Sequence, residues 1–233
     1  MSPHRAGAPD SRTAAAGTTT AAGTTDPVPD AGTDGTAAPP ARPERGFARF
    51  VTDAFEPKNW IIALTVVVGW QVAGLTGVGW GLFGAVFAAV FPVLFITFGI
   101  RRGTWADRHL GVRQQRLVAM VFIISSVLTG TLLMVLLGAP QAMVALIAAM
   151  VATLVVLMAI TVAWKVSVHA AVSAGSVAIL TLVFHGPHPL VLLPLVVLVG
   201  WSRIALRDHT PAQVVTGALL GALIAGSTFA LLR

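Results

Sequence analysis

Two long stretches without any ionisable side chain constrain the fold of this chain most strongly. Residues 59–100 and 117–164 contain no Asp, Glu, Lys, Arg or His. Of all 233 residues, 56% are hydrophobic and only 10% are charged, whereas about one quarter of the residues in a soluble domain are charged. This imbalance excludes an ordinary soluble domain and predicts an integral membrane protein.

Seven apolar segments follow one another from Asn59 onward. They cover residues 59–76, 80–100, 117–138, 142–164, 166–184, 189–201 and 211–232. About 20 helical residues, with a rise of about 1.5 Å each, cross a hydrocarbon core of about 30 Å. The fifth and sixth segments are short, which leaves open whether they are tilted, partly submerged or joined in a tight hairpin. We predict an all-α fold, a polytopic transmembrane helical bundle of six to seven spans.

The N-terminal part of the chain differs sharply from the rest. Residues 1–45 are rich in Ala, Thr, Pro and Gly and almost empty of large apolar residues. Such a segment buries too little surface to offset the entropy lost on ordering. We therefore predict a disordered tail over residues 1–45, a juxtamembrane segment over 46–58 and a transmembrane domain over 59–233.

Three polar clusters interrupt the apolar segments. They are RRGTWADRHLGVRQQR (101–116), KVSVH (165–169) and SRIALRDH (202–209). Two apolar segments separate each cluster from the next, and an even number of crossings returns the chain to the same membrane face. We expect all three clusters to meet at one membrane boundary, where charged residues indicate a functional site.

The residue types in the clusters favour an oxyanion as the ligand. Arg, Lys, Ser and His predominate, and guanidinium groups form paired hydrogen bonds to phosphate oxygens. A divalent cation requires clustered carboxylates, yet only Asp107 and Asp208 follow Glu56. We therefore predict a site without a metal or other cofactor.

The basic character of the chain also bears on its partners and source. The net charge is +6, from 13 Arg and two Lys among other ionisable residues, but no long basic stripe lies outside the apolar region. We predict no nucleic-acid partner, and we expect a lipid phosphate and membrane lipids instead. Frequent Ala and the preference for Arg over Lys favour a bacterial source. The sequence leaves the oligomeric state unknown.

In its polar clusters the sequence resembles the type 2 phosphatidic acid phosphatases, which are lipid phosphate phosphatases related to vanadium haloperoxidases. The family signature has three parts, written K-x6-R-P, P-S-G-H and S-R-x5-H-x3-D. The corresponding residues here are His109, six residues and Arg116 for the first part, Val166-Ser167-Val168-His169 for the second, and Ser202-Arg203, five residues and His209 for the third. The resemblance covers about residues 100–230.

This resemblance implies a phosphohistidine mechanism. His209 would attack phosphorus, and His169 would protonate the leaving lipid alkoxide. The implied phosphate-binding residues, with the nearby cations of the clusters, are His109, Arg113, Arg116, Lys165, Ser167 and Arg203. The implied function is hydrolysis of a phosphatidate-type or isoprenoid phosphate monoester or diphosphate, which makes residues 59–233 a phosphatase-like transmembrane domain.

The chain departs from the family pattern at several positions. Gln213 replaces an Asp that orients the nucleophilic imidazole in the family, and glutamine accepts a hydrogen bond without bringing a negative charge. Asp208 and Asp107 are alternative partners, and Thr210-Pro211-Ala212-Gln213 also fits a helix capping box. His109 replaces a Lys, which makes that contact pH-dependent. These substitutions keep open an inactive relative that binds lipid phosphates or acts as a membrane scaffold.

The side of the membrane that carries the site has two interpretations. We predict a multi-pass protein of the plasma (inner) membrane. The loops opposite the clusters, TGVG (76–79), APQ (139–141) and HGPHP (185–189), contain no Lys or Arg, so the positive-inside rule places the clusters in the cytoplasm. The better-known family members act on the outer face, which favours an extracytoplasmic site by analogy.

Overall fold

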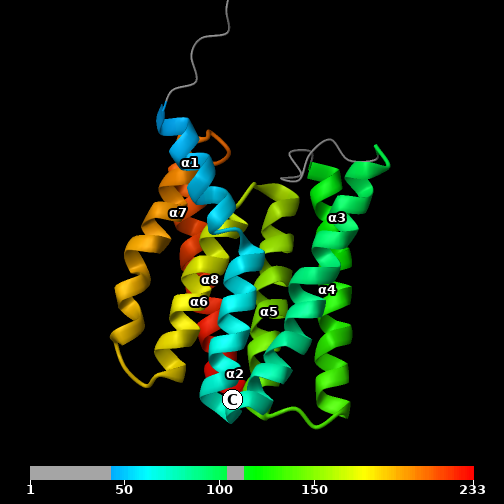
Figure 1. The fold of residues 1–233 in the computed structure, drawn as a ribbon. Helices are drawn as coiled ribbons and strands as arrows, with labels where there is room; N and C mark the ends of the chain where they lie inside the picture. Colours follow the sequence, from blue (N-terminus) through cyan, green and yellow to red (C-terminus); the bar gives the residue numbers. More distant parts are fainter. Residues whose placement is uncertain (1–42, 104–112) are drawn as a thin grey trace, which may run out of the picture. The chain divides into compact units, whose positions relative to one another are not determined.

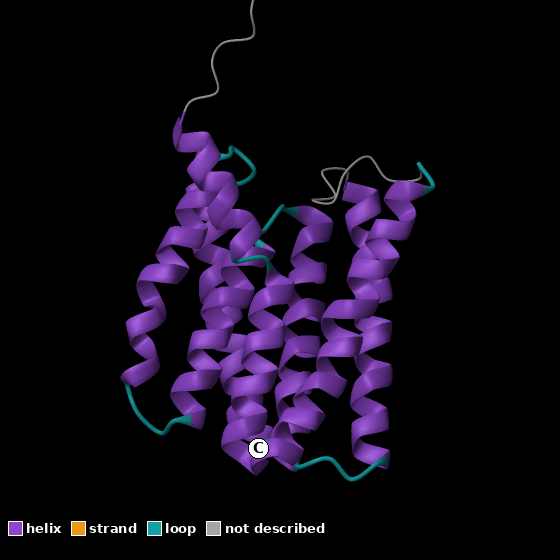
Figure 2. Ribbon diagram, viewed as in Figure 1, coloured by secondary structure: helices purple, strands orange, loops and turns teal. Residues whose placement is uncertain are grey.

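The computed structural model describes residues 43–103 and 113–233, and every regular element in these residues is a helix (Figures 1 and 2). The elements in chain order are α1 (Pro43–Ala54), α2 (Pro57–Ala85), the π-helix η1 (Val86–Val90), α3 (Phe91–Arg101), α4 (Arg113–Leu136), α5 (Gln141–Ala163), α6 (Val168–Val183), the 3₁₀ helix η2 (His188–Leu192), α7 (Leu193–Ala205) and α8 (Pro211–Leu232). The predicted all-α polytopic bundle is confirmed. Most of the predicted tail lies outside the described residues, so the division into a tail, a juxtamembrane segment and a transmembrane domain stays a prediction.

Within the described residues, five helical runs are long and apolar enough to cross a membrane. They cover residues 45–101, 114–136, 141–163, 188–205 and 211–232, and the shorter apolar helix α6 lies between the third and fourth. At a rise of about 1.5 Å per residue, the last four runs, of 18 to 23 residues, match a hydrocarbon core of about 30 Å, and the first, of 57 residues, is long enough for two crossings. The helices therefore support a multi-pass membrane protein.

The first of these runs reverses direction inside α2. Gly74 has a φ of +55°, a left-handed conformation that favours glycine, and Ala73 beside it is also non-helical. Beyond the reversal the two arms touch backbone to backbone, because a Cβ added to Gly77 would lie 1.9 Å from the Gly69 carbonyl oxygen. The run thus provides two antiparallel arms, as the sequence predicts. The reversal lies at residues 73–74 rather than in 76–79, because Gly77 is needed within the second arm for this close contact.

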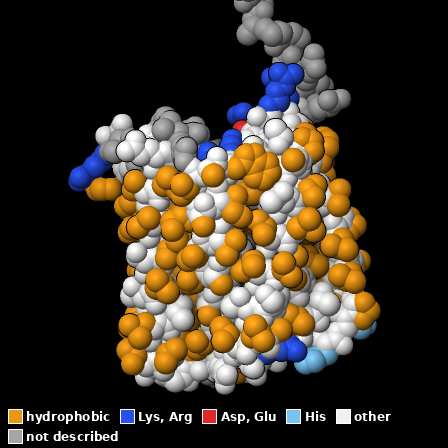
Figure 3. Space-filling model, turned by 180° about the vertical axis from the view of Figure 1, so that it is seen from behind, with side chains coloured by type: hydrophobic (Ala, Val, Ile, Leu, Met, Phe, Trp, Pro, Cys, Tyr) orange, Lys and Arg blue, Asp and Glu red, His pale blue; other side chains and the backbone are white. Residues whose placement is uncertain are grey.

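The antiparallel order of the helices gathers the polar clusters at one end of the bundle. The end of α3, the start of α4, the α5–α6 and α7–α8 connections and the helix α1 all lie at this end, whereas the C terminus lies at the other (Figure 1). Seen from behind, apolar side chains cover the length of the helices, and Lys and Arg gather mainly at the α1 end (Figure 3). Arg233 lies at the other end, where its Nη1 donates a hydrogen bond to the Leu182 carbonyl oxygen at 2.6 Å.

Helices α6 and α8 pack in close contact and hold two of the polar clusters together. Gly217 and Gly221 recur at a four-residue spacing that is typical of close helix pairs. A Cβ added to Gly217 would lie 2.5 Å from the Ser167 carbonyl oxygen, and one added to Gly221 would lie 2.1 Å from that of Ala171. The Ser167 amide also donates a hydrogen bond to the Gln213 carbonyl oxygen at 3.2 Å. The first turns of the two helices are therefore fixed side by side.

This contact makes the fold sensitive to a single methyl group. We expect Gly221→Ala to lower the free energy of unfolding by about 1–3 kcal/mol, since the new Cβ forces two backbones apart. Thermal unfolding of the purified protein in detergent measures the effect. Gly226→Ala is the matched control, because its Cβ would meet the Ala178 methyl group at an ordinary 3.4 Å. Equal stability of the two variants would contradict the close α6–α8 packing.

Candidate active site

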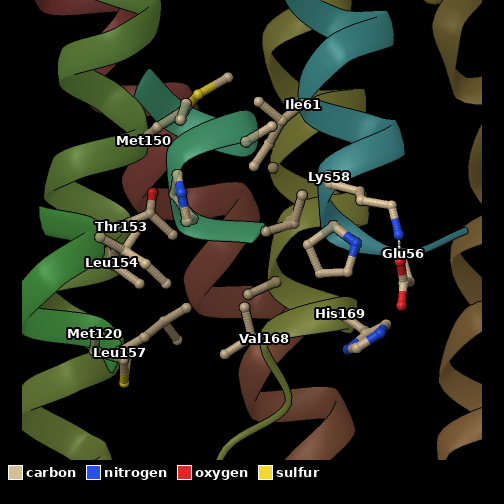
Figure 4. Close-up of a pocket in the computed structure, with 18 of the residues that line it drawn as sticks. Glu56, Lys58, Ile61, Met120, Met150, Thr153, Leu154, Leu157, Val168 and His169 are labelled. Atoms are coloured by element: carbon tan, nitrogen blue, oxygen red, sulfur yellow. Dashed lines mark ion pairs between the residues drawn. The ribbon is translucent and has the colours of Figure 1, made fainter. Parts of the chain in front are cut away.

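A cavity of about 610 Å³ extends from the charged end of the bundle into its apolar interior. Its charged and histidine side chains come from the α1–α2 junction, α4, the α5–α6 and α7–α8 connections and the adjoining ends of α6 and α7. They are Glu56, Lys58, Arg116, Lys165, His169, Arg203, Asp208 and His209. Figure 4 shows His169 at one end of this cavity, with Met150, Leu154 and Leu157 along another part of the wall. The three polar clusters of the sequence thus meet in one amphiphilic cavity.

Arg203 provides a buried cation in the cavity wall. It lies in the last turn of α7, is only 3% exposed, and its Nη2 lies 2.9 Å from Asp208 Oδ2. Its Nε and Nη1 are buried and have no hydrogen-bond partner. A buried guanidinium with two unsatisfied donors is costly without an acceptor. An oxyanion in the cavity would satisfy both donors at once.

The turn after α7 places His209 beside Arg203. The amides of Asp208 and His209 both donate to the Arg203 carbonyl oxygen, at 3.1 and 3.2 Å, and Arg207 between them and the helix has a φ of 59°. The chain thereby folds back over the end of α7. As a result, His209 and the Asp208 carboxylate face the same cavity as the guanidinium.

The His209 ring is neutral over the physiological pH range. Its pKa is lowered from 6.5 to about 4, chiefly by burial and then by the positive charges of Lys165 and Arg203, while a hydrogen bond with the Gln213 side chain acts in the opposite direction. Its Nδ1 atom is buried without a hydrogen-bond partner. A neutral imidazole retains the lone pair that a nucleophile requires.

The α5–α6 connection brings Lys165 and His169 to the same cavity. Lys165 Nζ donates to the backbone carbonyl oxygen of Asp208 at 2.5 Å, which ties this connection to the α7–α8 turn. Burial lowers the Lys165 pKa, and the neighbouring Arg116 charge lowers it further. His169 follows in the first turn of α6 and lines the cavity.

Two predicted site residues have structural roles at helix starts. The Ser167 hydroxyl is fully buried and accepts from the Ala170 amide at 3.3 Å, so it caps α6. The Gln213 Oε1 accepts from the Thr210 amide at 3.1 Å, and the Thr210 hydroxyl accepts from the Gln213 amide at 3.3 Å. The predicted capping box is therefore confirmed. Neither Ser167 nor Gln213 belongs to the described cavity wall.

The remaining predicted residues divide into two groups. Arg116 lies in the first turn of α4 and lines the cavity. His109 and Asp107 lie outside the described residues, as does the side chain of Arg113. Their proposed contacts with phosphate stay predictions.

Two residues of the cavity wall escaped the sequence analysis. Glu56 and Lys58 form an ion pair and line the cavity from the α1–α2 junction. The sequence feature that could have indicated them is Glu-Pro-Lys directly before the first apolar segment, which places an acid and a base at the membrane boundary. Their position near the other clusters depends on how α1 packs, which no local pattern reveals.

The fold and the cavity define a class, a multi-pass helical membrane protein with a cationic, histidine-bearing cavity at one end. Residues 163–233 match the family model of the PAP2 superfamily. This match includes the second and third motifs and the helices α6 to α8, and it confirms the resemblance found in the sequence. It supports a phosphatase-type function in general. No curated protein and no solved structure matches the chain.

Proposed function

We propose that this protein is an integral membrane phosphatase that hydrolyses the phosphate monoester or diphosphate of a phosphatidate-type or isoprenoid lipid, through a phosphohistidine and without a metal. The observation that carries this proposal is the composition of the cavity at the charged end of the bundle. His169, His209 and the buried Arg203 line one part of it, and apolar side chains line the rest. The polar part of the cavity therefore suits the phosphate group of a lipid phosphate, and the apolar part suits its hydrocarbon chain.

The proposed reaction has two steps. First, a ring nitrogen of His209 forms a bond to phosphorus while the bond between phosphorus and the lipid oxygen breaks, and His169 gives its proton to that oxygen. Next, water attacks the phosphohistidine, His169 takes a proton from the water, and inorganic phosphate leaves. Splitting the displacement and protonating the leaving group each lower a barrier.

The cations of the cavity stabilise the charge that develops on the phosphoryl oxygens. Arg203 offers two donors that have no other partner, and Arg116 and Lys165 line the same cavity. Donors that are already in place need no reorganisation during the reaction, and they act strongly in a site shielded from water. The same cations explain why a metal is not needed for charge neutralisation in this mechanism.

The apolar part of the cavity favours a lipid over a soluble phosphate ester. Its wall includes Met120 and Leu157 near the polar end and Ile123, Met150 and Ile179 deeper in the bundle. Burying a chain against such side chains contributes about 25 cal/mol per Å² of apolar surface. A soluble ester lacks this contribution.

An inactive relative that binds lipid phosphates is the second candidate. It is favoured by the His209 Nδ1, which has no hydrogen-bond partner, and by the Asp208 carboxylate, which pairs with Arg203. In an inactive relative the same cavity would bind the lipid phosphate, but His209 would lack the anionic partner that stabilises a charged imidazole.

Phosphate release by the purified protein in detergent distinguishes the two candidates. With a chelator present, we expect turnover of long-chain phosphatidate or an isoprenoid monophosphate. Glycerol 3-phosphate, which has the phosphate but no chain, should react at least about tenfold more slowly. Binding of the lipid phosphate without release would support the inactive relative. Equal rates for the lipid and glycerol 3-phosphate would contradict the lipid assignment.

The lowered pKa of His209 predicts an unusual titration. Because its pKa is about 4, the ring should stay neutral as the pH falls from 7 to about 5 and should protonate only near pH 4. The histidine carbon chemical shifts of labelled protein measure this, with His209→Ala to assign the signal. A midpoint near 6.5, the ordinary value, would show that the ring is solvated instead of buried.

A further inference from the structure

The α1–α2 junction directs a carboxylate into the cavity. Glu56 occupies the N-cap position of α2, but its side chain makes no capping hydrogen bond, and Pro57 follows in the first helical turn. An acidic residue at an N-cap usually accepts from the helix amides. The Glu56 carboxylate instead lines the cavity and is ion paired with Lys58, and the Glu56 side chain is only 12% exposed.

The junction is held firmly in this position. Asn59 Nδ2 donates to the Ala54 carbonyl oxygen at 2.9 Å, and the Phe55 and Trp60 rings lie 6.2 Å apart. These contacts close the turn between α1 and α2. Glu56, in the middle of the turn, therefore has little backbone freedom.

Helix α1 is also tied to the helix that carries Arg203. The hydroxyls of Thr52 and Ser202 lie 3.0 Å apart and are buried. Ser202 Oγ donates to the Val199 carbonyl oxygen at 2.8 Å, so Thr52 is the donor in the bond between the two hydroxyls. Because Ser202 directly precedes Arg203, this bond fixes α1 beside the site.

Glu56 and Asp208 are the two carboxylates in the described cavity wall. Asp208 lies on the α7–α8 side, where its carboxylate is 2.9 Å from the Arg203 guanidinium. Glu56 lies on the other side, and its carboxylate points toward the His169 ring in Figure 4. The Asp208 carboxylate is thus paired with Arg203, whereas the Glu56 carboxylate lies on the side of His169.

We propose that Glu56, which is ion paired with Lys58, is a positioning residue for His169, whose imidazole it holds as the proton donor. This inference rests on the proposed function and adds a residue outside the region matched by the family model. The carboxylate accepts a hydrogen bond from one ring nitrogen, so the other nitrogen carries its proton toward the leaving oxygen. Glu56 itself gains and loses no proton in the reaction.

The charge of the cavity makes such a partner necessary. The cations that share the cavity with His169 come from α2 (Lys58), α4 (Arg116), the α5–α6 connection (Lys165) and α7 (Arg203), and His209 and Asp208 line it from the α7–α8 turn. Nearby positive charges disfavour the protonated form of an imidazole. A carboxylate beside the ring offsets them and favours the protonated form of the donor.

Two variants of the Glu56–Lys58 ion pair test this proposal. If Glu56 supports His169, Glu56→Gln should lower the midpoint of the His169 titration by about one pH unit, which corresponds to a tenfold change in the protonation equilibrium. Lys58→Met removes a nearby cation and should raise that midpoint. Histidine chemical shifts measure both, with His169→Ala to assign the signal. If the Glu56–Lys58 ion pair has no influence on His169, neither variant should change the midpoint of the His169 titration.

Kinetics supply the second readout. In Glu56→Gln the loss of kcat at alkaline pH should begin about one unit lower, with KM for the lipid changed less than kcat. Unchanged titration midpoints, or midpoints that move in the same direction in both variants, would overturn the role of Glu56. Absence of turnover in the wild type, together with opposite shifts in the two variants, would overturn the proposed function and leave the Glu56–His169 pairing in place.

Discussion

His209→Ala is expected to lower kcat for a lipid phosphate by at least about a thousandfold, because it removes the atom that bonds to phosphorus. The folded state should change little, since the ring is only half-buried and Gln213, which bonds to the ring, keeps its cap bond to the Thr210 amide. Single-turnover phosphate release in the presence of a chelator measures the loss. His188→Ala is the matched control, because His188 is exposed and lies in the α6–α7 connection. This connection is at the end of the bundle opposite the α7–α8 turn that carries His209.

The covalent step gives this prediction a second test. Wild-type protein mixed with lipid labelled in its phosphate should carry the label on a histidine, in a form that survives base and is lost in acid. The same experiment with His209→Ala should yield no labelled protein. A His209→Ala protein that keeps turnover within tenfold of the wild type would exclude His209 as the nucleophile.

Much of the fold follows from patterns that are local in the sequence. Apolar segments of membrane-spanning length predict helices directly, because a backbone in hydrocarbon must satisfy its own hydrogen bonds. The number of segments between the clusters then places all three at one end of the bundle. The four-residue spacing of Gly217 and Gly221 likewise corresponds to a close helix contact. In each case one physical constraint leaves a single arrangement.

The parts that the sequence analysis missed depend on packing between distant segments. The position of Glu56 depends in part on the buried Thr52–Ser202 hydrogen bond, whose partners are 150 residues apart. The two helix caps illustrate a different difficulty. Ser167 and Gln213 match positions of the family motifs, yet the hydroxyl of one and the Oε1 of the other bond to backbone amides. A polar residue at a helix start always has this local alternative.

Arg203→Met is expected to weaken the binding of inorganic phosphate by at least about a hundredfold. Two hydrogen bonds from a charged donor contribute about 1.5–3 kcal/mol each, and Nε and Nη1 are the two donors without another partner. Arg203→Lys should fall between the wild type and Arg203→Met, since an ammonium keeps the charge but lacks the planar pair of donors. Calorimetric titration of the purified protein measures these affinities.

Arg207→Met is the control that separates phosphate binding from the general charge of this loop. Arg207 lies in the same turn but is exposed and does not line the described cavity, so its removal should change phosphate affinity by less than about threefold at moderate salt. In Arg203→Met the Asp208 carboxylate loses its guanidinium partner. Because the Asp208 side chain is 38% exposed, water still solvates the carboxylate. Thermal unfolding should accordingly change less than phosphate binding. Equal losses of affinity in Arg203→Met and Arg207→Met would mean that phosphate responds to net charge alone and that the buried guanidinium does not form the anion site.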